Sequence, residues 1–582
     1  MSILDWIVLL ATTFLIVGYG IWKSRGATNI RGYLLADKEM KWWTIGLSIM
    51  ATQASAITFL STPGQAFDDG MRFVQFYFGV PIAMVIISMV AIPIYHRLNV
   101  YTAYEYLESR FDVKVRSFTA FLFLVSRGLA AGLTIYAPAI ILSTILEWNI
   151  GMTIRGIGVL VVFYTVLGGA KAVNYTQKQQ MIVILIGMFL AGIWMVLKLP
   201  EDISFGSAVA VAGKMGKLNA ITMGTEGGGF DLKDRYNLFS GLIGGTFLAL
   251  SYFGTDQSQV QRYLGGKSLS ESRIGLLFSG MVKVPMQFLI LFIGVLMFMF
   301  YQFEKGPIFF NQNVNQEMRV SELGESYTAL EDEYSQLHAE KQQTIRQLIT
   351  SMDSGDEAQT NSLTTNLKAQ QQQERDLRES AKSLITQHDP DADTNDKDKV
   401  FLTFVVTKLP QGLVGLLIAV ILAASMSSTA AELNALGTTT LIDGYKRFSK
   451  TEKSDKHFLN VSRGLTFFWG ILAILFALFA NKLGNMIQAV NIIGSLFYGT
   501  ILGIFVVAFF FKQIRGTAVF LGAIMAEICV IALFILPQQY PSLAWLDIGF
   551  LWYNLIGCAI VVILAFIFQQ ALPKTDSISP FI

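Results

Sequence analysis

Cysteine and histidine are scarce in this chain. Its 582 residues include 2 Cys and 4 His, and both cysteines, Cys529 and Cys558, lie in apolar stretches. Without clustered thiol and imidazole groups, the sequence offers no disulfide framework and no zinc site. It also lacks an activated nucleophile of the kind that a membrane enzyme would need. The composition therefore predicts a protein that is not an enzyme.

Charged residues are also few. They make up 15% of the chain, whereas hydrophobic residues make up 53%, and the mean hydropathy is +0.49. A soluble protein of this length would not tolerate such a composition. The net charge of +2 creates no strong field that would attract nucleic acid. These values predict an integral membrane protein that has the lipid bilayer, and no nucleic acid, as a partner.

Long apolar runs predict about thirteen membrane-spanning helices. The first run, Ile3–Trp22, is followed and not preceded by basic residues, which is the opposite of a signal peptide. Basic residues gather in alternate loops such as His96–Arg116 and Tyr445–Arg463. By the positive-inside rule, the N-terminus should lie outside and the C-terminus inside a multi-pass protein of the cell (inner) membrane. The expected limits are 3–22, 43–66, 74–95, 117–146, 152–168, 179–198, 238–257, 274–301, 403–433, 460–480, 485–511, 516–537 and 549–571.

Residues 303–400 are too polar to enter lipid. They carry two apolar stripes with heptad spacing, separated by the breaker Ser354–Asp356. This pattern predicts an antiparallel helical hairpin outside the membrane, where an outer partner could reach it. The first stripe comprises Val320, Leu323, Tyr327, Leu330, Tyr334 and Leu337, and the second comprises Leu363, Leu367, Leu377, Ala381 and Leu384.

The run Gly412–Asp443 combines an apolar helix with hydroxyl groups at lipid depth. Ser427 and Ser428 follow small alanines, which leaves room for backbone and hydroxyl oxygens around a small hard cation. The alternative is that these hydroxyls, together with Ser425 and Thr429, only pack one helix against another.

Two spans are predicted to be interrupted near the midplane. The span from Trp43 carries several Ser, Thr and Gln residues and then Pro63-Gly64, and the span at residues 237–261 contains GLIGG followed by SYFGTDQ. Interrupted helices in the second and seventh spans indicate an inverted five-plus-five repeat with a transport site between its halves. In that arrangement one Na⁺ could be surrounded by oxygens of Ala51, Ala54, Ala424, Ser427 and Ser428.

Several motifs resemble those of the sodium:solute symporter family. They are ATQASAITFL, GGAKAVNYTQ, TDQSQVQRYL and AASMSSTAAELNALGTTTLIDGY, and the likeness runs from about Arg31 to Phe511 except for the hairpin. The family includes sodium/glucose, sialic acid, monocarboxylate, multivitamin and iodide cotransporters. The resemblance implies an all-α, LeuT-like 5+5 inverted repeat preceded by one extra helix. It also implies that the Na⁺ site lies at the same five residues: Ala51, Ala54, Ala424, Ser427 and Ser428.

The domain organisation expected from this resemblance has seven parts. Residues 1–30 form the extra helix and a basic inner loop, 31–199 the first repeat, 200–237 an outer loop, 238–302 the start of the second repeat, 303–400 the hairpin, 401–511 the rest of the second repeat, and 512–582 the C-terminal membrane helices.

The substrate positions depart from the pattern of a bacterial sodium/galactose member of the family. Tyr252 and Lys283 match that pattern, but its sugar-binding amides and carboxylate are replaced by Thr58, Tyr77, Ala249 and Asn491. Arg127 lies deep in the fourth span, where a guanidinium is costly unless it faces a cavity or a partner. Sialic acid transporters of the family place an arginine in this helix to hold a carboxylate. The alternative is that Arg127 pairs with a neighbouring acid or carbonyl.

These observations predict a Na⁺-coupled symporter that imports a small polar organic solute by alternating access. The solute would be an organic anion, such as sialate or a monocarboxylate, or a sugar. The alternative is a membrane sensor that keeps the transporter fold and binds solute without net transport. Family members that bind a second Na⁺ are expected from this resemblance to place an acid in the sixth span and two further serines one turn after the first pair. The acid position here is Gln177, and the serine positions are Ala430 and Ala431. None of these side chains supplies a charge, so one Na⁺ per solute is expected.

Overall fold

Helices make up all the longer regular elements of the structure, which is a computed structural model. It describes residues 1–24, 30–146, 148–225, 230–390, 392–449, 453–480 and 486–572. Within these ranges, 10 helical stretches are long and apolar enough to cross a membrane. The chain is therefore an all-α, multi-pass membrane protein, as predicted. The count of about thirteen spans and the orientation in the membrane stay predictions.

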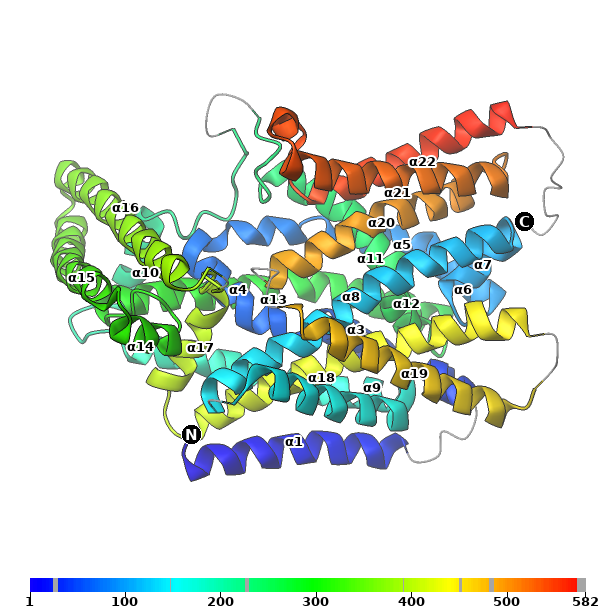
Figure 1. The fold of residues 1–582 in the computed structure, drawn as a ribbon, viewed down its shortest axis with the longest axis horizontal. Coiled ribbons are helices and arrows are strands. Elements are labelled where there is room, and N and C mark those ends of the chain that lie inside the picture. The colour runs from blue at the N-terminus through cyan, green and yellow to red at the C-terminus, as the bar shows by residue number, and fades with distance from the viewer. Residues whose placement is uncertain are drawn as a thin grey trace.

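The elements follow one another along the chain with few long connections (Figure 1). The first half comprises α1 (Ile3–Ser24), α2 (Ile30–Leu35), α3 (Trp42–Gln53), α4 (Ala56–Asp69), η2 (Gly70–Tyr77), α5 (Val80–Met89), α6 (Ala91–Leu98), α7 (Ala103–Arg110), α8 (Val113–Leu146), α9 (Ile150–Leu197) and α10 (Phe205–Lys214). The second half comprises η3 (Ser240–Gly244), α11 (Gly245–Gly254), α12 (Gln257–Leu264), α13 (Leu269–Phe303), α14 (Gln312–Val320), α15 (Gly324–Ser354), α16 (Glu357–His388), α17 (Lys397–Lys408), α18 (Leu413–Thr439), η4 (Thr440–Lys446), α19 (Asp455–Ala477), α20 (Met486–Phe510), α21 (Gly516–Gln539) and α22 (Leu551–Ala571).

Two transmembrane paths are broken, and the first break includes Ala54 of the predicted Na⁺ site. It lies at Ala54 and Ser55, between α3 and α4, and Pro63 is inside α4. The predicted interruption at Pro63-Gly64 is therefore wrong. Close packing of α13 and α17 on this part of α4 keeps it helical despite the proline. The second break separates α11 from α12. The π-helical turn η3 just before α11 contains GLIGG except for its last glycine, Gly245, which begins α11.

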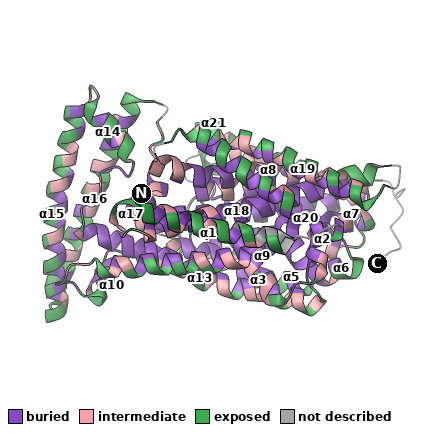
Figure 2. Cartoon of the chain, turned by 90° about the horizontal axis from the view of Figure 1, so that it is seen from below, coloured by how far each residue is buried: buried purple, intermediate pink, exposed green. Residues whose placement is uncertain are grey.

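Helix α18 lies at the centre of the bundle. It packs against α9, α1 and α8 and also touches α3 and α4, and every residue from Ala423 to Thr439 is buried (Figure 2). The hydroxyl groups of this stretch therefore face protein and not lipid. A polar group in this position needs a partner on a neighbouring helix.

Helices α15 and α16 form a long hairpin that projects from one end of the bundle (Figures 1 and 2). Gly355, with φ of 73°, makes the left-handed turn between them. Tyr327, Tyr334 and Leu337 are buried as the heptad pattern predicts, whereas Val320 ends α14 and is 86% exposed. Including Val320 in the stripe was therefore wrong. The first residues of α1 lie at the same end as the hairpin, and the last residues of α22 lie at the other end.

Helix α17 links this hairpin to the second half of the broken path. Lys397 forms an ion pair with Asp68 at the end of α4, and Gly64 approaches the Lys397 carbonyl so closely that a Cβ would overlap it. Lys217 caps the C-terminus of α4, because its ammonium donates to the carbonyls of Phe67 and Asp68. Burial lowers the pKa of Lys217 to about 8.

The Gly64 contact leads to a stability prediction. Gly64→Ala should lower the thermal unfolding midpoint of the purified protein, because overpacking against a backbone carbonyl typically costs ~1–3 kcal/mol. Gly464→Ala in α19 is the matched control, since no atom lies within 4 Å of its added methyl and alanine favours helix. An unchanged midpoint for Gly64→Ala would contradict the close contact between α4 and α17.

Candidate sodium and solute site

The predicted Na⁺ site lies where the end of α3 meets α18. Ser427 Oγ donates to the Ala51 carbonyl at 3.3 Å, and Ser428 Oγ donates to the Ala424 carbonyl at 3.0 Å. Ala54, one residue beyond α3, is fully buried. Because the helix ends here, carbonyl groups of its last turn are released from i→i+4 bonding. The contact thus gathers uncharged oxygens of the kind that coordinate Na⁺.

The hydroxyl groups of α18 serve two different neighbours. Ser425 Oγ donates to the Thr134 carbonyl at 2.7 Å, and Thr429 Oγ1 donates to Thr134 Oγ1 at 2.9 Å. Both bonds tie α18 to α8. Ser425 and Thr429 therefore act in helix packing, whereas Ser427 faces the break in the α3–α4 path.

Gln177 of α9 lies beside this contact. Its Nε2 donates to Thr52 Oγ1 at 3.0 Å and to the Ser427 carbonyl at 3.4 Å, and its Oε1 accepts from Ser48. The amide thus places donor hydrogens, and not an anionic oxygen, against α18. Ala430 and Ala431 nearby along α18 are fully buried methyl groups.

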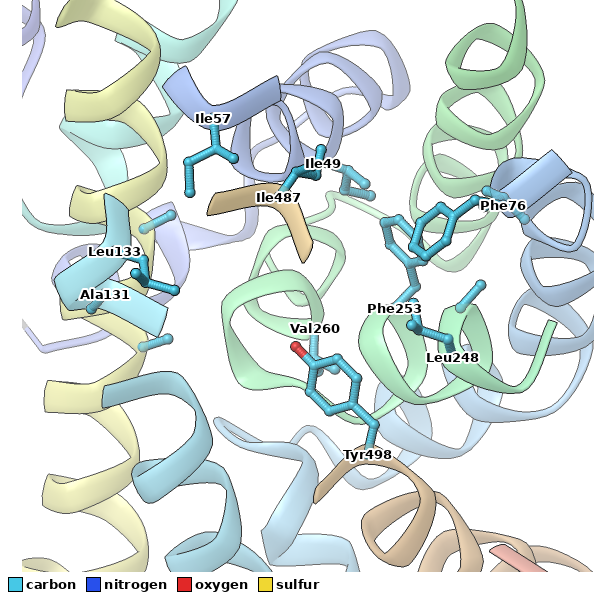
Figure 3. Packing of buried hydrophobic residues seen from close by; sticks show 14 of the residues in the cluster. Ile49, Ile57, Phe76, Ala131, Leu133, Leu248, Phe253, Val260, Ile487 and Tyr498 are labelled. Atoms are coloured by element: carbon cyan, nitrogen blue, oxygen red, sulfur yellow. The ribbon is translucent and has the colours of Figure 1, made fainter. Parts of the chain in front are cut away.

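A cavity of about 90 Å³ opens next to the break. Apolar side chains of α4, α11 and α20, among them Ile57, Leu248 and Ile487, form part of its wall (Figure 3). The structure brings five of the six predicted substrate residues into its lining, and these are Thr58, Tyr77, Arg127, Tyr252 and Asn491.

Lys283 of α13, the sixth predicted substrate residue, is not in the cavity lining. Its Nζ lies 5.2 Å from the ring centroid of Tyr77, which does line the cavity. The side chain is buried, and its ammonium has no hydrogen-bond partner within the part of the chain that the structure describes. Lys283 is thus a buried amine one side chain away from the cavity.

Arg127 of α8 is already well partnered. Its guanidinium binds Asp256 through Nε at 3.1 Å and also through Nη2, and binds Glu432 through Nη1 at 2.9 Å. It also donates to the Tyr498 hydroxyl and lies 5.2 Å from the ring centroid of Tyr252. The formal charges of Asp256, Glu432 and Arg127 add up to −1, because two carboxylates face one guanidinium.

Sequence analysis did not assign Asp256, Glu432 or Tyr498 to the site. Asp256 caps α12 directly after the second break, and that position next to an interrupted helix was the available signal. Glu432 follows the serine pair by one turn of α18. Tyr498 belongs to α20 and carried no sequence signal, because tyrosine is common in apolar spans.

The chain matches the model of the sodium:solute symporter family over residues 33–324 and 389–528. These residues cover more than half of the sequence and exclude most of the hairpin. The chain belongs to the sodium:solute symporter family. Membership confirms the prediction of a membrane transporter and not an enzyme, in a family whose transport is coupled to Na⁺.

Relatives of this symporter transport chemically different solutes. It is 25% identical to the sodium/glucose cotransporter of Vibrio parahaemolyticus over 93% of this chain and 87% of that protein. It is 28% identical to the human sodium/iodide cotransporter, but this match spans 49% of the chain and only 43% of the relative. It is 31% identical to sodium-coupled monocarboxylate transporter 1 of Xenopus laevis over 43% of the chain and 39% of the relative.

The fold is similar to a solved structure of a Na⁺-coupled sialic acid symporter. The TM-score is 0.73, with 22% sequence identity and 98% coverage of both chains. The two chains therefore share their fold over almost their whole length. At this level of identity the similarity concerns the fold alone.

Proposed function

We propose that this symporter imports a small polar organic solute together with Na⁺ by alternating access. The solute is an organic anion, such as sialate or a monocarboxylate, or a sugar. The observation that carries the proposal is that residues of the predicted Na⁺ site and residues of the solute cavity both lie at the break between α3 and α4. Ala51 and Ala54 belong to the predicted Na⁺ site, while Thr52, Ser55 and Thr58 line the cavity.

Sharing the break couples the two ligands. An ion held between α3 and α18 draws the carbonyls at the end of α3 towards Ser427 and Ser428. This movement fixes the position of the first turn of α4. The same turn carries cavity residues such as Thr58, so Na⁺ raises the affinity for solute, and by linkage solute raises the affinity for Na⁺. The membrane potential adds about 2.3 kcal/mol per charge for each 100 mV.

The charges around the cavity suggest how an anionic solute would bind. An anion near Arg127 must displace Asp256 or Glu432, which already hold the guanidinium. Lys283 offers an Nζ that no described residue hydrogen-bonds, and a rotation of the Tyr77 ring would expose it. Helix α4 also begins at the cavity, because its N-cap residue Ser55 belongs to the lining, and the helix dipole favours electron-rich solute groups there. In this proposal Lys283 binds the carboxylate, and Arg127 holds the cavity walls in place.

A second candidate function is a sensor that binds solute without transporting it. Counterflow distinguishes this sensor from a symporter. In proteoliposomes loaded with unlabelled solute, a transporter accumulates labelled solute by counterflow, and an inward Na⁺ gradient increases the initial rate. Solute binding without any counterflow would support the sensor and overturn the proposed symport.

We also propose that one Na⁺ accompanies each solute. The Gln177 amide directs hydrogens to the Ser427 carbonyl and Thr52, and a cation gains nothing from donor hydrogens or from the methyls of Ala430 and Ala431. The Hill coefficient for Na⁺ should be about 1, as for a single coupled site. The reversal potential should correspond to the transport of one Na⁺ per solute. Sigmoidal activation that persists in Gln177→Ala would reveal a second ion elsewhere.

A further inference from the structure

A groove of about 680 Å³ runs along the lateral surface of the helix bundle, separate from the solute cavity. One wall is the second part of α9, from Leu185 to Leu197, and the other is α13, from Met286 to Leu296. All of the side chains that line it are apolar. Phe205 of α10 joins the lining and packs edge to face on Phe292.

The groove opens towards the position of the lipid. Both walls belong to candidate membrane spans, Thr176–Leu197 and Leu269–Phe303. Ile186, Phe189 and Leu289 on its rim are 52%, 64% and 58% exposed. Exposed apolar side chains within membrane spans face hydrocarbon, and water has no hydrogen-bond partner in such a groove.

The length of the groove matches one leaflet of a bilayer. At 1.5 Å per residue, the wall from Leu185 to Leu197 is ~18 Å long and the wall from Met286 to Leu296 is ~15 Å long. Half of a hydrocarbon core of about 30 Å is ~15 Å. A single extended acyl chain that enters from the headgroup level would therefore follow the groove along its whole length.

We propose that this groove binds one acyl chain of a bilayer phospholipid. Its floor reaches Phe59 of α4, which is fully buried. Phe59 is adjacent to Thr58, which lines the solute cavity. The acyl chain and the solute thus contact different faces of the same turn of the broken path, and a bound lipid supports this turn from the membrane side.

Glycine at position 192 allows a precise test. A Cβ on Gly192 would meet Ile293 Cγ1 at 3.5 Å and Leu296 Cδ1 at 3.9 Å, which are ordinary contacts. Gly192→Phe therefore fills the groove without overlapping the backbone. Gly156→Phe is the matched control. Gly156 lies in the first candidate span of α9, Ile150–Ala170, where it is exposed and has no atom within 4 Å of an added Cβ.

The experiment uses the full chain in nanodiscs that contain phosphatidylcholine with a diazirine in one acyl chain. After illumination, mass spectrometry should place the label on peptides from both walls of the groove. Gly192→Phe should lose most of this label, and Gly156→Phe should keep it, while both variants elute and melt like the wild type. Mapping in the wild type needs no variant, so a folding defect in Gly192→Phe does not prevent the test.

Three outcomes would overturn the proposal. The label could be spread evenly over the exposed spans, which indicates only annular lipid. It could be undiminished in Gly192→Phe. A crosslink between the groove residues of two copies would show that a second chain, and not lipid, covers this face.

Discussion

Ser428→Ala is expected to weaken Na⁺ activation of uptake sharply without unfolding the protein. The substitution removes a hydroxyl oxygen beside the Ala424 carbonyl on α18. Losing one buried polar ligand costs ~1–3 kcal/mol, so the Na⁺ concentration for half-maximal uptake should rise roughly 5- to 150-fold. Uptake of labelled solute at varied Na⁺ in proteoliposomes measures this change.

Ser425→Ala is the control for this experiment. Its hydroxyl donates to the Thr134 carbonyl on α8, so the variant removes a helix-packing bond of similar size on the same helix. Its effect should appear in the thermal midpoint and leave the Na⁺ dependence unchanged. If Ser428→Ala retained wild-type Na⁺ affinity, the assigned site would have to be abandoned.

Lys283→Met is expected to abolish most transport of an acidic solute and to spare a neutral one. A charge-assisted hydrogen bond to a buried ammonium is worth ~1.5–3 kcal/mol, so the apparent KM for an acidic solute should rise about tenfold or more. Methionine keeps the apolar stem of the lysine, so packing against Tyr77 is preserved. Competition between a panel of acidic and neutral solutes measures the effect.

Arg127→Lys separates the role of Arg127 from that of Lys283. The lysine cannot reproduce the contacts of the guanidinium with Asp256, Glu432 and Tyr498, because its ammonium is a single point charge. Uptake of acidic and neutral solutes should therefore fall together. A rise in KM for acidic solutes alone would instead make Arg127 the carboxylate clamp and refute the role proposed for Lys283.

Sequence reasoning named many residues that meet in the candidate site, but it did not predict their contacts. The pair Ser427 and Ser428 could be recognised because hydroxyls at lipid depth are rare and must have a partner. The sequence also led to the break beside Ala54, but it wrongly predicted a further interruption at Pro63-Gly64, because proline is a visible helix breaker. Packing by α13 and α17 overrides the proline signal, and such packing depends on residues distant in the sequence.

Arg127 shows the same limit. Its depth in the fourth span indicated a functional or paired guanidinium, and the sequence left both alternatives open. Asp256 is 129 residues away and Glu432 is 305 residues away along the chain. Only the fold decides that both carboxylates reach one guanidinium.

The sequence by itself determined the membrane class, the position of the polar hairpin and the family of this symporter. The membrane class and the hairpin follow from local composition and periodicity, since each apolar run must satisfy its own backbone within the bilayer. The family follows from the resemblance of four sequence motifs. The tertiary structure decided where α3 ends, which hydroxyls of α18 face that end, and which buried amine near the cavity has no hydrogen-bond partner among the described residues. These features arise from close packing between helices that are far apart in the chain, and local sequence does not encode such packing in a form that can be read directly.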